Sequence, residues 1–465
     1  PICSVYKQCG GCQLQHMDSS EQNTFKENKV KDCFHKIAGM NVEIQPIIKV
    51  EPHWNYRNKV QIPVQYNDNK VEMGFYAPHS NHIVQYDVCH VQTDLSNELT
   101  NYFRKQFDML ACAKEVRHVL IKHAHNTGEV MVALVVRNYP FHNSDSLIKD
   151  VLANYPQIKS LVAIVNKRED NVILDGKEIL LAGRHYIEEE LLGCTFRISA
   201  RSFYQINPYA TRELYSKAIE LACLTGNETL IDLYCGTGTM GIIAAKQAKQ
   251  VYGIEIVADA IRDANTNAEN NNVTNIKFIN ADASEGAQQI IKSKIQADAM
   301  IIDPPRKGCS KDTIDAIVTI APKRLVYVSC DPATLARDVK ILSDNGYKLE
   351  LVQPVDLFPQ TVHVETVALL SKLDVDKHIS VKIELDELDL TSAESKATYA
   401  QIKEYILEKF GLKVSALYIA QIKKKCGIEL RENYNKSKKE KQVIPQCTSE
   451  KEEAIMDALR HFKMI

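Results

Sequence analysis

Cys330 is the side chain whose position in the sequence most favours covalent chemistry. It follows the apolar run 324–328 and precedes Asp331, Pro332 and a stretch of helical periodicity. Proline is favourable at the first position of a helix, so Cys330 is predicted at a helix N-terminus. There the helix dipole would stabilise a thiolate and lower the pKa of the thiol. Because free cysteines are commonly buried packing residues, Cys330 by itself does not establish a catalytic site.

A thiolate in this position has a specific use in pyrimidine chemistry. Addition of sulfur to C6 of uracil makes C5 nucleophilic enough to accept a methyl group, and a base must then remove the C5 proton before the cysteine can leave. Glu365 begins another apolar strand and is the candidate for that base. The segment Asp303–Arg306 (Asp-Pro-Pro-Arg) ends a further predicted strand. The joint occurrence of these three features favours catalysis over packing.

A glycine-rich segment, Asp232–Gly241, follows the apolar run 229–233 and opens a predicted helix. Glycines allow the backbone to turn tightly and to approach a ligand, and the acid Glu255 at the end of the next strand can accept hydrogen bonds from ribose hydroxyls. This pattern alone is compatible with NAD as the cofactor. The glycines of the G-x-G-x-x-G pattern are Gly236, Gly238 and Gly241.

Two features favour S-adenosylmethionine (SAM) over NAD. The form Asp-x-x-Cys-Gly-Thr-Gly at 232–238 resembles motif I of methyltransferases. The segment Asp303–Arg306 follows the fourth strand of the unit, and the carboxyl ends of strands in an α/β sheet face the ligand crevice.

The elements that must position these residues fall into two kinds. Between 57 and 200 apolar and polar residues alternate, as at 60–66 and 130–136, which is typical of antiparallel strands, with one helix near 92–110. From about 208 short apolar runs alternate with helical stretches, which predicts an α/β fold with a parallel sheet. Its buried strands are predicted at 229–234, 251–255, 276–279, 298–302 and 325–329, and a further helix at about 19–38.

Composition excludes several classes of protein. The 465 residues carry 57 Lys and Arg against 59 Asp and Glu, a net charge of 57 − 59 = −2, so any contact with nucleic acid must come from a local patch. No apolar stretch approaches the roughly 18 residues that a membrane span needs. No secretion signal is present, so a cytoplasmic protein is expected. The chain opens at Pro1, which suggests that an upstream piece is missing.

Three N-terminal cysteines form a tight cluster. Cys3, Cys9 and Cys12 lie close together in the sequence, and Cys89 offers a fourth thiolate, whereas the adjacent His90 is interpreted as a bystander. Four thiolates suit tetrahedral zinc or an iron–sulfur cluster, and the spacing does not decide between them.

Five motifs, in this order, resemble the family of SAM-dependent RNA uracil-5-methyltransferases. They are 202–207 (SFYQIN), 232–238 (DLYCGTG), 303–306 (DPPR), 329–332 (SCDP) and 363–365 (HVE). The resemblance implies that Cys330 is the nucleophile and Glu365 the proton acceptor. It also implies cofactor contacts at Gln205, Tyr234, Gly236, Gly238, Thr239, Glu255, Asp282 and Asp303.

The same resemblance bears on the cysteines and on the substrate. Ribosomal-RNA members of the family carry C-x5-C-G-G-C-x-L-Q-H and one distant cysteine that together hold a [4Fe–4S] cluster, and 3–16 matches this pattern without a gap. Many transfer-RNA members lack the cluster. The resemblance therefore implies that Cys3, Cys9, Cys12 and Cys89 ligate a [4Fe–4S] cluster and that the substrate is 23S rRNA, with tRNA as the alternative.

Phosphate contacts are expected from cationic side chains near these motifs. Arg57 and Lys59 begin a predicted strand and should emerge on one exposed face, and Arg306 lies beside Asp303. The segment 423–441 adds eight Lys and Arg against three Glu, as an RNA footprint or as a solvated helix face.

The predicted architecture is α/β with four parts. They are an iron–sulfur segment and helix (1–39), a β-rich central RNA-binding domain (40–200), a Rossmann-like methyltransferase domain (201–373), and a C-terminal extension (374–465) with an acidic linker at 374–394 and lysine-rich helices. The predicted function is methylation of uridine C5 in 23S rRNA by a monomer. An NAD-linked oxidoreductase and a non-catalytic metal-bearing RNA-binding module are alternatives from other classes.

Overall fold

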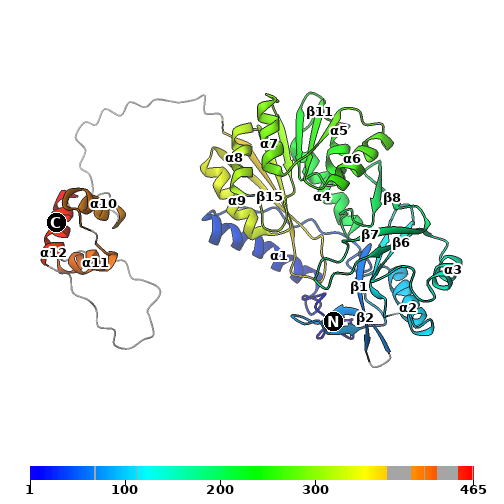
Figure 1. Ribbon diagram of the computed structural model, residues 1–465. Coiled ribbons are helices and arrows are strands. Elements are labelled where there is room, and N and C mark those ends of the chain that lie inside the picture. The colour runs from blue at the N-terminus through cyan, green and yellow to red at the C-terminus, as the bar shows by residue number, and fades with distance from the viewer. Residues whose placement is uncertain are drawn as a thin grey trace. The chain divides into compact units, whose positions relative to one another are not determined.

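A computed structural model describes residues 1–67, 70–112, 114–373, 399–412, 414–426, 449–462 and 464. The chain divides into two compact units, Pro1–Val375 and Asp376–Ile465 (Figure 1). Within the described residues, no helix combines the length and the apolar character needed to cross a membrane.

The alternating segment of unit 1 forms a seven-stranded sheet with strand order β3-β2-β1-β4-β5-β6-β7. Most neighbours are antiparallel, as the alternation predicts, but β5 and β6 run parallel because helix α3 (Ser144–Asn154) connects them as a crossover. The strands are β1 (Lys59–Asn67), β2 (Lys70–Tyr76), β3 (Ile83–Gln85), β4 (Val116–His123), β5 (Val130–Val136), β6 (Ile158–Val165) and β7 (Lys177–Gly183).

Both faces of this central sheet are covered. Helices α2 (Asp94–Met109) and α3 (Ser144–Asn154) pack apolar side chains, among them Phe103 and Leu147, against one face. The hairpin of β8 (Tyr186–Leu191) and β9 (Cys194–Ser199) packs against the other. The helix expected near 92–110 is α2.

The second sheet has the order β12-β11-β10-β13-β14-β16-β15. Its first five strands are parallel, and the expected apolar runs form them. The last two strands form an antiparallel hairpin, and its inner strand β16 runs antiparallel to β14. The strands are β10 (Thr229–Leu233), β11 (Gln250–Glu255), β12 (Ile276–Asn280), β13 (Ala299–Ile302), β14 (Arg324–Ser329), β15 (Tyr347–Val355) and β16 (Glu365–Lys372).

Helices cover both faces of this second sheet, which is why its central strands read as continuous apolar runs (Figure 1). One face carries α4 (Pro208–Ala222), α5 (Thr239–Ala245) and α6 (Ala258–Asn270). The other carries α1 (Ser19–Cys33), α7 (Ala283–Lys292), α8 (Lys311–Ile320) and α9 (Pro332–Asp344). The N-terminal helix expected at 19–38 is α1 with the π-helical turn Phe34–Ala38, and it packs on α9.

The described part of unit 2 forms three helices around a core made mainly of isoleucines and alanines. They are α10 (Tyr399–Phe410), α11 (Ala416–Lys425) and α12 (Ser449–His461). The acidic segment 374–394 lies outside the described residues, and of the lysine-rich segment 423–441 only 423–426 is described.

Candidate active site

A cleft of about 860 Å³ opens at the carboxyl ends of the parallel strands of the second sheet. It lies where the strand order reverses between β10 and β13, the position at which open α/β sheets bind ligands. The cleft brings together nine of the residues expected at a cofactor or substrate site. They are Gln205, Tyr234, Gly236, Glu255, Asp282, Asp303, Arg306, Cys330 and Glu365.

The glycine-rich turn between β10 and α5 forms one wall. Its backbone takes positive φ at Tyr234, Gly236 and Gly238, and a Cβ at Gly238 would lie 2.8 Å from the ring of Phe278. Glycine is therefore required there on two counts. Gly238 caps α5 and the buried Thr239 begins it, so both stand behind the residues that line the cleft.

The carboxylate of Glu255 is fixed beside this turn. The Gly236 N–H donates to Oε2 at 3.1 Å, and the Val257 N–H donates to Oε1 at 2.9 Å. Because Glu255 ends β11 inside the cleft, it stands where an acid can accept hydrogen bonds from ribose hydroxyls.

The buried side chain of Asp232 supports the glycine-rich turn by a hydrogen bond. Its Oδ2 accepts a hydrogen bond from the Gly241 N–H at 2.8 Å, and a Cβ at Gly241 would collide with that oxygen. Burial, followed by the charges of Asp303 and Glu255, raises the pKa of Asp232 to about 7. Within the described residues its Oδ1 has no partner. Asp232 is thus a support of the glycine turn rather than part of the cleft wall.

Strand register places the two predicted catalytic residues together. In the antiparallel pair β14–β16, Ser329 lies opposite Thr366, so the next step along the pair brings Cys330 opposite Glu365. Cys330 is partly exposed in the cleft, whereas Glu365 is buried. Asp331 caps α9 by accepting a hydrogen bond from the Ala333 N–H at 2.9 Å, so Cys330 does stand just before a helix N-terminus.

The pKa of the Cys330 thiol is raised, whereas its place at a helix N-terminus predicted a lowered pKa. Burial, followed by the charge of Glu365, raises the pKa of Cys330 to about 11, while Arg306 opposes the rise. The expected lowering of the thiol pKa is therefore wrong for the protein without ligands, because desolvation and nearby carboxylates outweigh the helix N-terminus. Burial raises the pKa of Glu365 to about 8, with Asp303 contributing, and that of Asp303 to about 7.

The loop 356–364 ahead of Glu365 contributes Phe358 to the cleft, a residue that the sequence did not single out. Buried Lys26 of α1 forms an ion pair with buried Asp356 and donates to the carbonyl of Phe358 at 3.0 Å. Removing one partner of a buried ion pair lowers the free energy of unfolding by about 3–5 kcal/mol, because the other charge is left buried without compensation. The first helix therefore fixes the loop that carries the candidate base.

Gln360 connects the same loop by hydrogen bonds to residues 13–22, which follow the N-terminal cysteines. Its carbonyl accepts hydrogen bonds from the Gln13 and Leu14 N–H groups at 3.0 Å, and its side chain and N–H exchange hydrogen bonds with the Gln22 side chain at 2.9 Å. These contacts hold Gln360 at a φ of +70°, an uncommon conformation for a residue with a Cβ.

The structure corrects the placement of Arg57. A backbone bridge to Gln92 carries Arg57 into the loop of Cys89, so its side chain lines a different cavity instead of an exposed strand face. Lys59 begins β1 and is largely buried, and this burial lowers the pKa of its ammonium group. Arg306, by contrast, is exposed at the cleft as expected.

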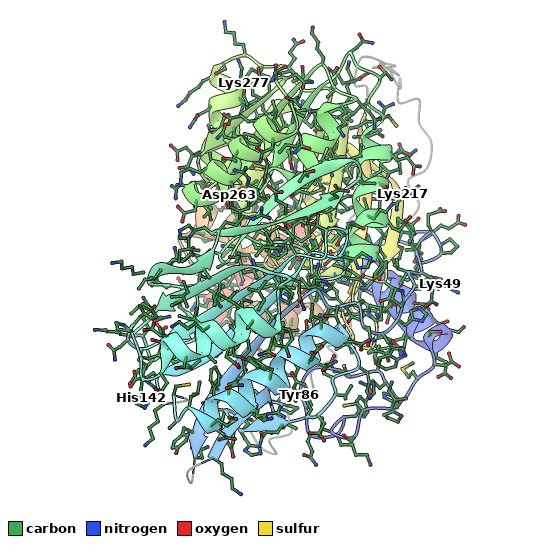
Figure 2. All side chains as sticks on the ribbon, turned by 90° about the vertical axis from the view of Figure 1, so that its right-hand side faces the viewer. Lys49, Tyr86, His142, Lys217, Asp263 and Lys277 are labelled. Atoms are coloured by element: carbon green, nitrogen blue, oxygen red, sulfur yellow. The ribbon has the colours of Figure 1, made fainter. Side chains whose placement is uncertain are left out.

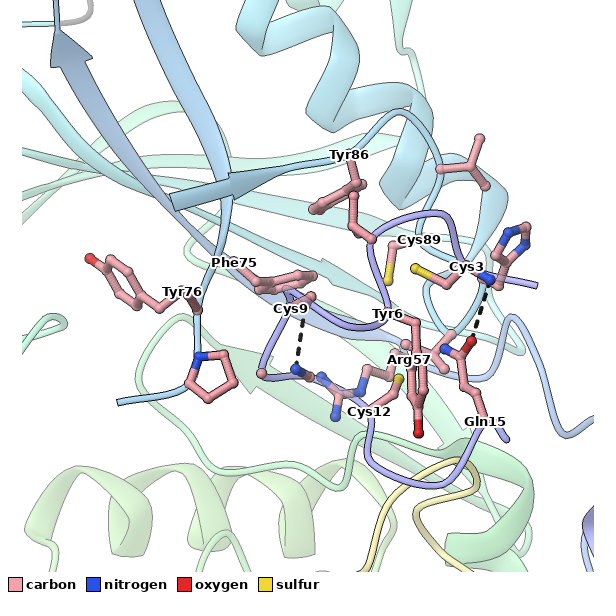
Figure 3. A pocket seen from close by; sticks show the side chains of 18 residues that line it. Cys3, Tyr6, Cys9, Cys12, Gln15, Arg57, Phe75, Tyr76, Tyr86 and Cys89 are labelled. Atoms are coloured by element: carbon pink, nitrogen blue, oxygen red, sulfur yellow. Dashed lines mark hydrogen bonds between the residues drawn. The ribbon is translucent and has the colours of Figure 1, made fainter. Parts of the chain in front are cut away.

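Four thiols line this second cavity, which has a volume of about 350 Å³ (Figure 3). They belong to Cys3, Cys9, Cys12 and Cys89. The Gly11 N–H donates to the Cys9 sulfur at 3.3 Å, and burial raises the pKa of the Cys89 thiol to about 11. No three His, Cys, Asp or Glu side chains of the described residues are arranged to hold a metal ion.

The four thiols share their cavity with one cationic side chain and with aromatic rings. Figure 3 shows the Arg57 guanidinium among the cysteines, and its buried Nε has no hydrogen-bond partner in the described chain. Tyr6, Phe75 and Tyr86 supply aromatic walls. The cavity therefore brings four thiols, one cation and one backbone amide donor together, although the thiols do not take the positions of metal ligands.

Three comparisons relate the chain to known proteins. Residues 19–373 match the model of the tRNA (uracil-5-)-methyltransferase family. RNA methyltransferases of Clostridium tetani and Listeria innocua are 40% and 42% identical over 379 residues, which is 80% of this chain and 82% and 83% of theirs. The solved tRNA (uracil-54, C5)-methyltransferase of Pyrococcus abyssi, in complex with S-adenosyl-L-homocysteine, is 28% identical with a TM-score of 0.64, over 78% of this chain and 86% of that one.

Proposed function

Because the chain belongs to the family of SAM-dependent RNA uracil-5-methyltransferases, we propose that it methylates C5 of a specific uridine in 23S rRNA and acts as a monomer. The observation that carries the reaction is the placement of Cys330 opposite Glu365 in the cofactor cleft. The four-cysteine cavity supports a ribosomal substrate, because the sequence motif around it resembles that of the ribosomal-RNA members. The solved relative from Pyrococcus abyssi is named for tRNA, which makes tRNA the second candidate.

The reaction follows from the chemistry of the two side chains. The Cys330 thiolate forms a bond to uracil C6, and the displaced electron pair is held as an enolate until C5 is methylated. The Glu365 carboxylate then takes the proton from C5, and the electrons of that C–H bond restore the C5–C6 double bond as the C6–sulfur bond breaks. SAM, when bound, supplies the electrophilic methyl group.

The residues proposed to hold SAM line or support the cleft. Glu255 would accept hydrogen bonds from the ribose, and the glycine turn at Gly236 and Gly238 allows close approach of the backbone. Thr239 supports the turn, and Gln205, Tyr234, Asp282 and Asp303 complete the walls. Arg306, exposed beside Cys330, is proposed to contact the RNA.

The ribosomal assignment is tested by mapping 5-methyluridine in a strain without this protein. We expect at least one 5-methyluridine to disappear from 23S rRNA and to return with the wild-type gene, but not with a gene that encodes Cys330→Ala. Loss from tRNA with an unchanged 23S rRNA would replace the ribosomal assignment by the tRNA one. Unchanged 5-methyluridine in both RNAs would contradict the proposal.

We further propose that the four thiols hold a [4Fe–4S] cluster, with a structural or RNA-positioning role because the chemistry needs no redox step. Protein purified without oxygen should show broad visible absorbance and about four irons per chain. Serine at Cys3, Cys9, Cys12 or Cys89 should remove the absorbance, whereas Cys223→Ser, on the exposed end of α4, should retain it. One zinc per chain and no colour would contradict this prediction.

A further inference from the structure

A basic cavity of about 450 Å³ lies in the central domain; it shares no lining residue with the catalytic cleft and only Tyr76 with the cysteine cavity. It is formed where β1 ends, β4 begins and β5 ends. Its described lining includes four basic side chains and no carboxylate, an unusual balance in a chain with a net charge of −2. The lining residues are Val64, Gln65, Tyr66, Asn67, Tyr76, Lys114, Val116, Arg117, His118 and Arg137.

Three of these cations have no carboxylate partner. The Lys114 ammonium lies over the Tyr66 ring, 4.9 Å from its centroid. The Arg117 guanidinium donates only to two backbone carbonyls, each at 3.4 Å, and the carboxylate of nearby Asp170 is engaged by Arg168. In the described part of the chain the Arg137 side chain forms neither a hydrogen bond nor an ion pair. These charges are therefore available to an anion.

A local irregularity in strand β4 sets the direction of the Arg117 side chain. The pairing of β4 with β5 shifts register between Val116 and His118, so Arg117 is the extra residue of a β-bulge. Bulges re-aim a side chain out of the regular strand alternation. They also carry a structural cost, because the ladder is locally disrupted.

His118, which follows Arg117 in the chain and lines the same cavity, is a second sign of a ligand. Its side chain is more than nine-tenths buried, and no described residue is a hydrogen-bond partner of its Nδ1. Burial, followed by the charge of Arg117, lowers the pKa of His118 to about 4. The imidazole is therefore neutral near pH 7, and it adds hydrogen-bonding capacity without adding to the repulsion among the cations.

We propose that this cavity binds the phosphates of a single-stranded segment of the RNA substrate, outside the target uridine. The proposal rests on the proposed function, which supplies RNA as the substrate. Arginine and lysine without carboxylate partners are the residues that bind phosphate. Tyr76 at the edge of the cavity is 38% exposed as a residue, and an exposed aromatic side chain offers a surface on which a base can stack.

The position of the basic cavity along β1 determines how long an RNA must be to reach both this cavity and the catalytic cleft. At the start of the strand, the Asn58 N–H donates to the Ile206 carbonyl at 2.9 Å, next to Gln205 of the catalytic cleft. Val64 is six residues further along, about 20 Å at the rise of a β-strand. An RNA whose uridine occupies the cleft must therefore extend by several nucleotides to reach the basic cavity.

The test compares two triple variants on a short and a long RNA. Lys114→Ala/Arg117→Ala/Arg137→Ala removes the cavity charges. The control Lys277→Ala/Lys292→Ala/Lys311→Ala removes three exposed lysines of the methyltransferase domain. Figure 2 shows that Lys277 lies at the end of unit 1 opposite His142 of the central domain. The short RNA covers only the target loop, and the long one extends it by about ten nucleotides. Kd is measured against salt concentration, and methyl transfer is measured in parallel.

We expect the cavity variant to lose affinity for the long RNA only. Three lost contacts to a single strand flatten the slope of log affinity against log salt by about 2, which corresponds to roughly 100-fold in Kd at 0.1 M salt. Methylation of the short RNA and binding of SAM should stay at the wild-type level, which also shows that the variant is folded.

Two results would overturn the inference. One is equal binding of the long RNA by the cavity variant and the control. The other is a wild-type protein that binds both RNAs equally. Failure of the proposed function has a different signature, since wild-type protein would then methylate neither RNA.

Discussion

RNA with 5-fluorouridine at the target position should form a stable covalent adduct with the wild-type protein, and Cys330→Ala should form none. The thiolate of Cys330 adds to C6 and C5 is methylated as usual. Fluorine cannot then leave C5 as a proton does, so the bond between sulfur and C6 persists. The adduct is measured as a protein–RNA species that survives denaturing electrophoresis.

On natural RNA the same variant should lose turnover almost completely. Removing the nucleophile of a covalent catalyst lowers kcat on the order of 10⁶-fold. Binding of SAM should be unchanged, because the residues proposed to contact it lie on other strands. Cys33→Ala is the matched control, since Cys33 is also half-buried and lies near Asp331, yet it does not line the cleft. An adduct or full turnover with Cys330→Ala would contradict the mechanism.

The raised thiol pKa gives the wild-type reaction a defined pH dependence. Because the pKa of Cys330 is about 11, only a small fraction of the free protein carries a thiolate at pH 7. At pH values below the pKa, the thiolate fraction rises about tenfold for each unit by which the pH increases. Arg306 beside the sulfur is the cation that can favour the thiolate as substrate enters.

The fold of the methyltransferase domain could be predicted because each of its parallel strands is covered on both faces. Such strands appear in the sequence as short apolar runs, as at 229–233 and 298–302, and the residues that follow them must meet at one edge of the sheet. This rule was sufficient to bring Gly236, Glu255 and Asp303 into one cleft. The strand that begins at Glu365 was predicted from its apolar run, but its antiparallel pairing with β14, which places Glu365 opposite Cys330, was not.

Burial and distant contacts could not be predicted from local pattern. Arg57 has a sequence context typical of an exposed strand end, but the bridge to Gln92 turns it into the cysteine cavity. Lys26 and Asp356 are 330 positions apart, and neither carries a local signal of the ion pair that fixes the loop ahead of Glu365. The pKa of Cys330 likewise depends on burial and then on carboxylates from other strands, whereas the sequence shows only its helix N-terminus.

Glu365→Gln should stop the reaction after the methyl group has been transferred. The amide cannot accept the C5 proton, so the methylated RNA should remain bonded to Cys330 and accumulate as a covalent adduct on natural RNA. Loss of a general base typically lowers turnover by about 10²–10⁴-fold. One equivalent of methyl transfer per protein without further turnover, measured with labelled SAM, is the expected result. Glu350→Gln, an exposed carboxylate on the adjacent strand β15, is the control and should turn over normally.

The pH profile separates a base from a residue that only supports the cleft. Burial raises the pKa of Glu365 to about 8, so the free protein holds this carboxyl mostly protonated at pH 7 and ionised above pH 8. Because only the ionised form can take the C5 proton, release of the adduct should accelerate with rising pH and level off above about 8. Glu365→Gln should lose this dependence, whereas a supporting residue would leave the profile in place. Rapid release of product by Glu365→Gln, with the wild-type pH profile, would assign the proton transfer to another group.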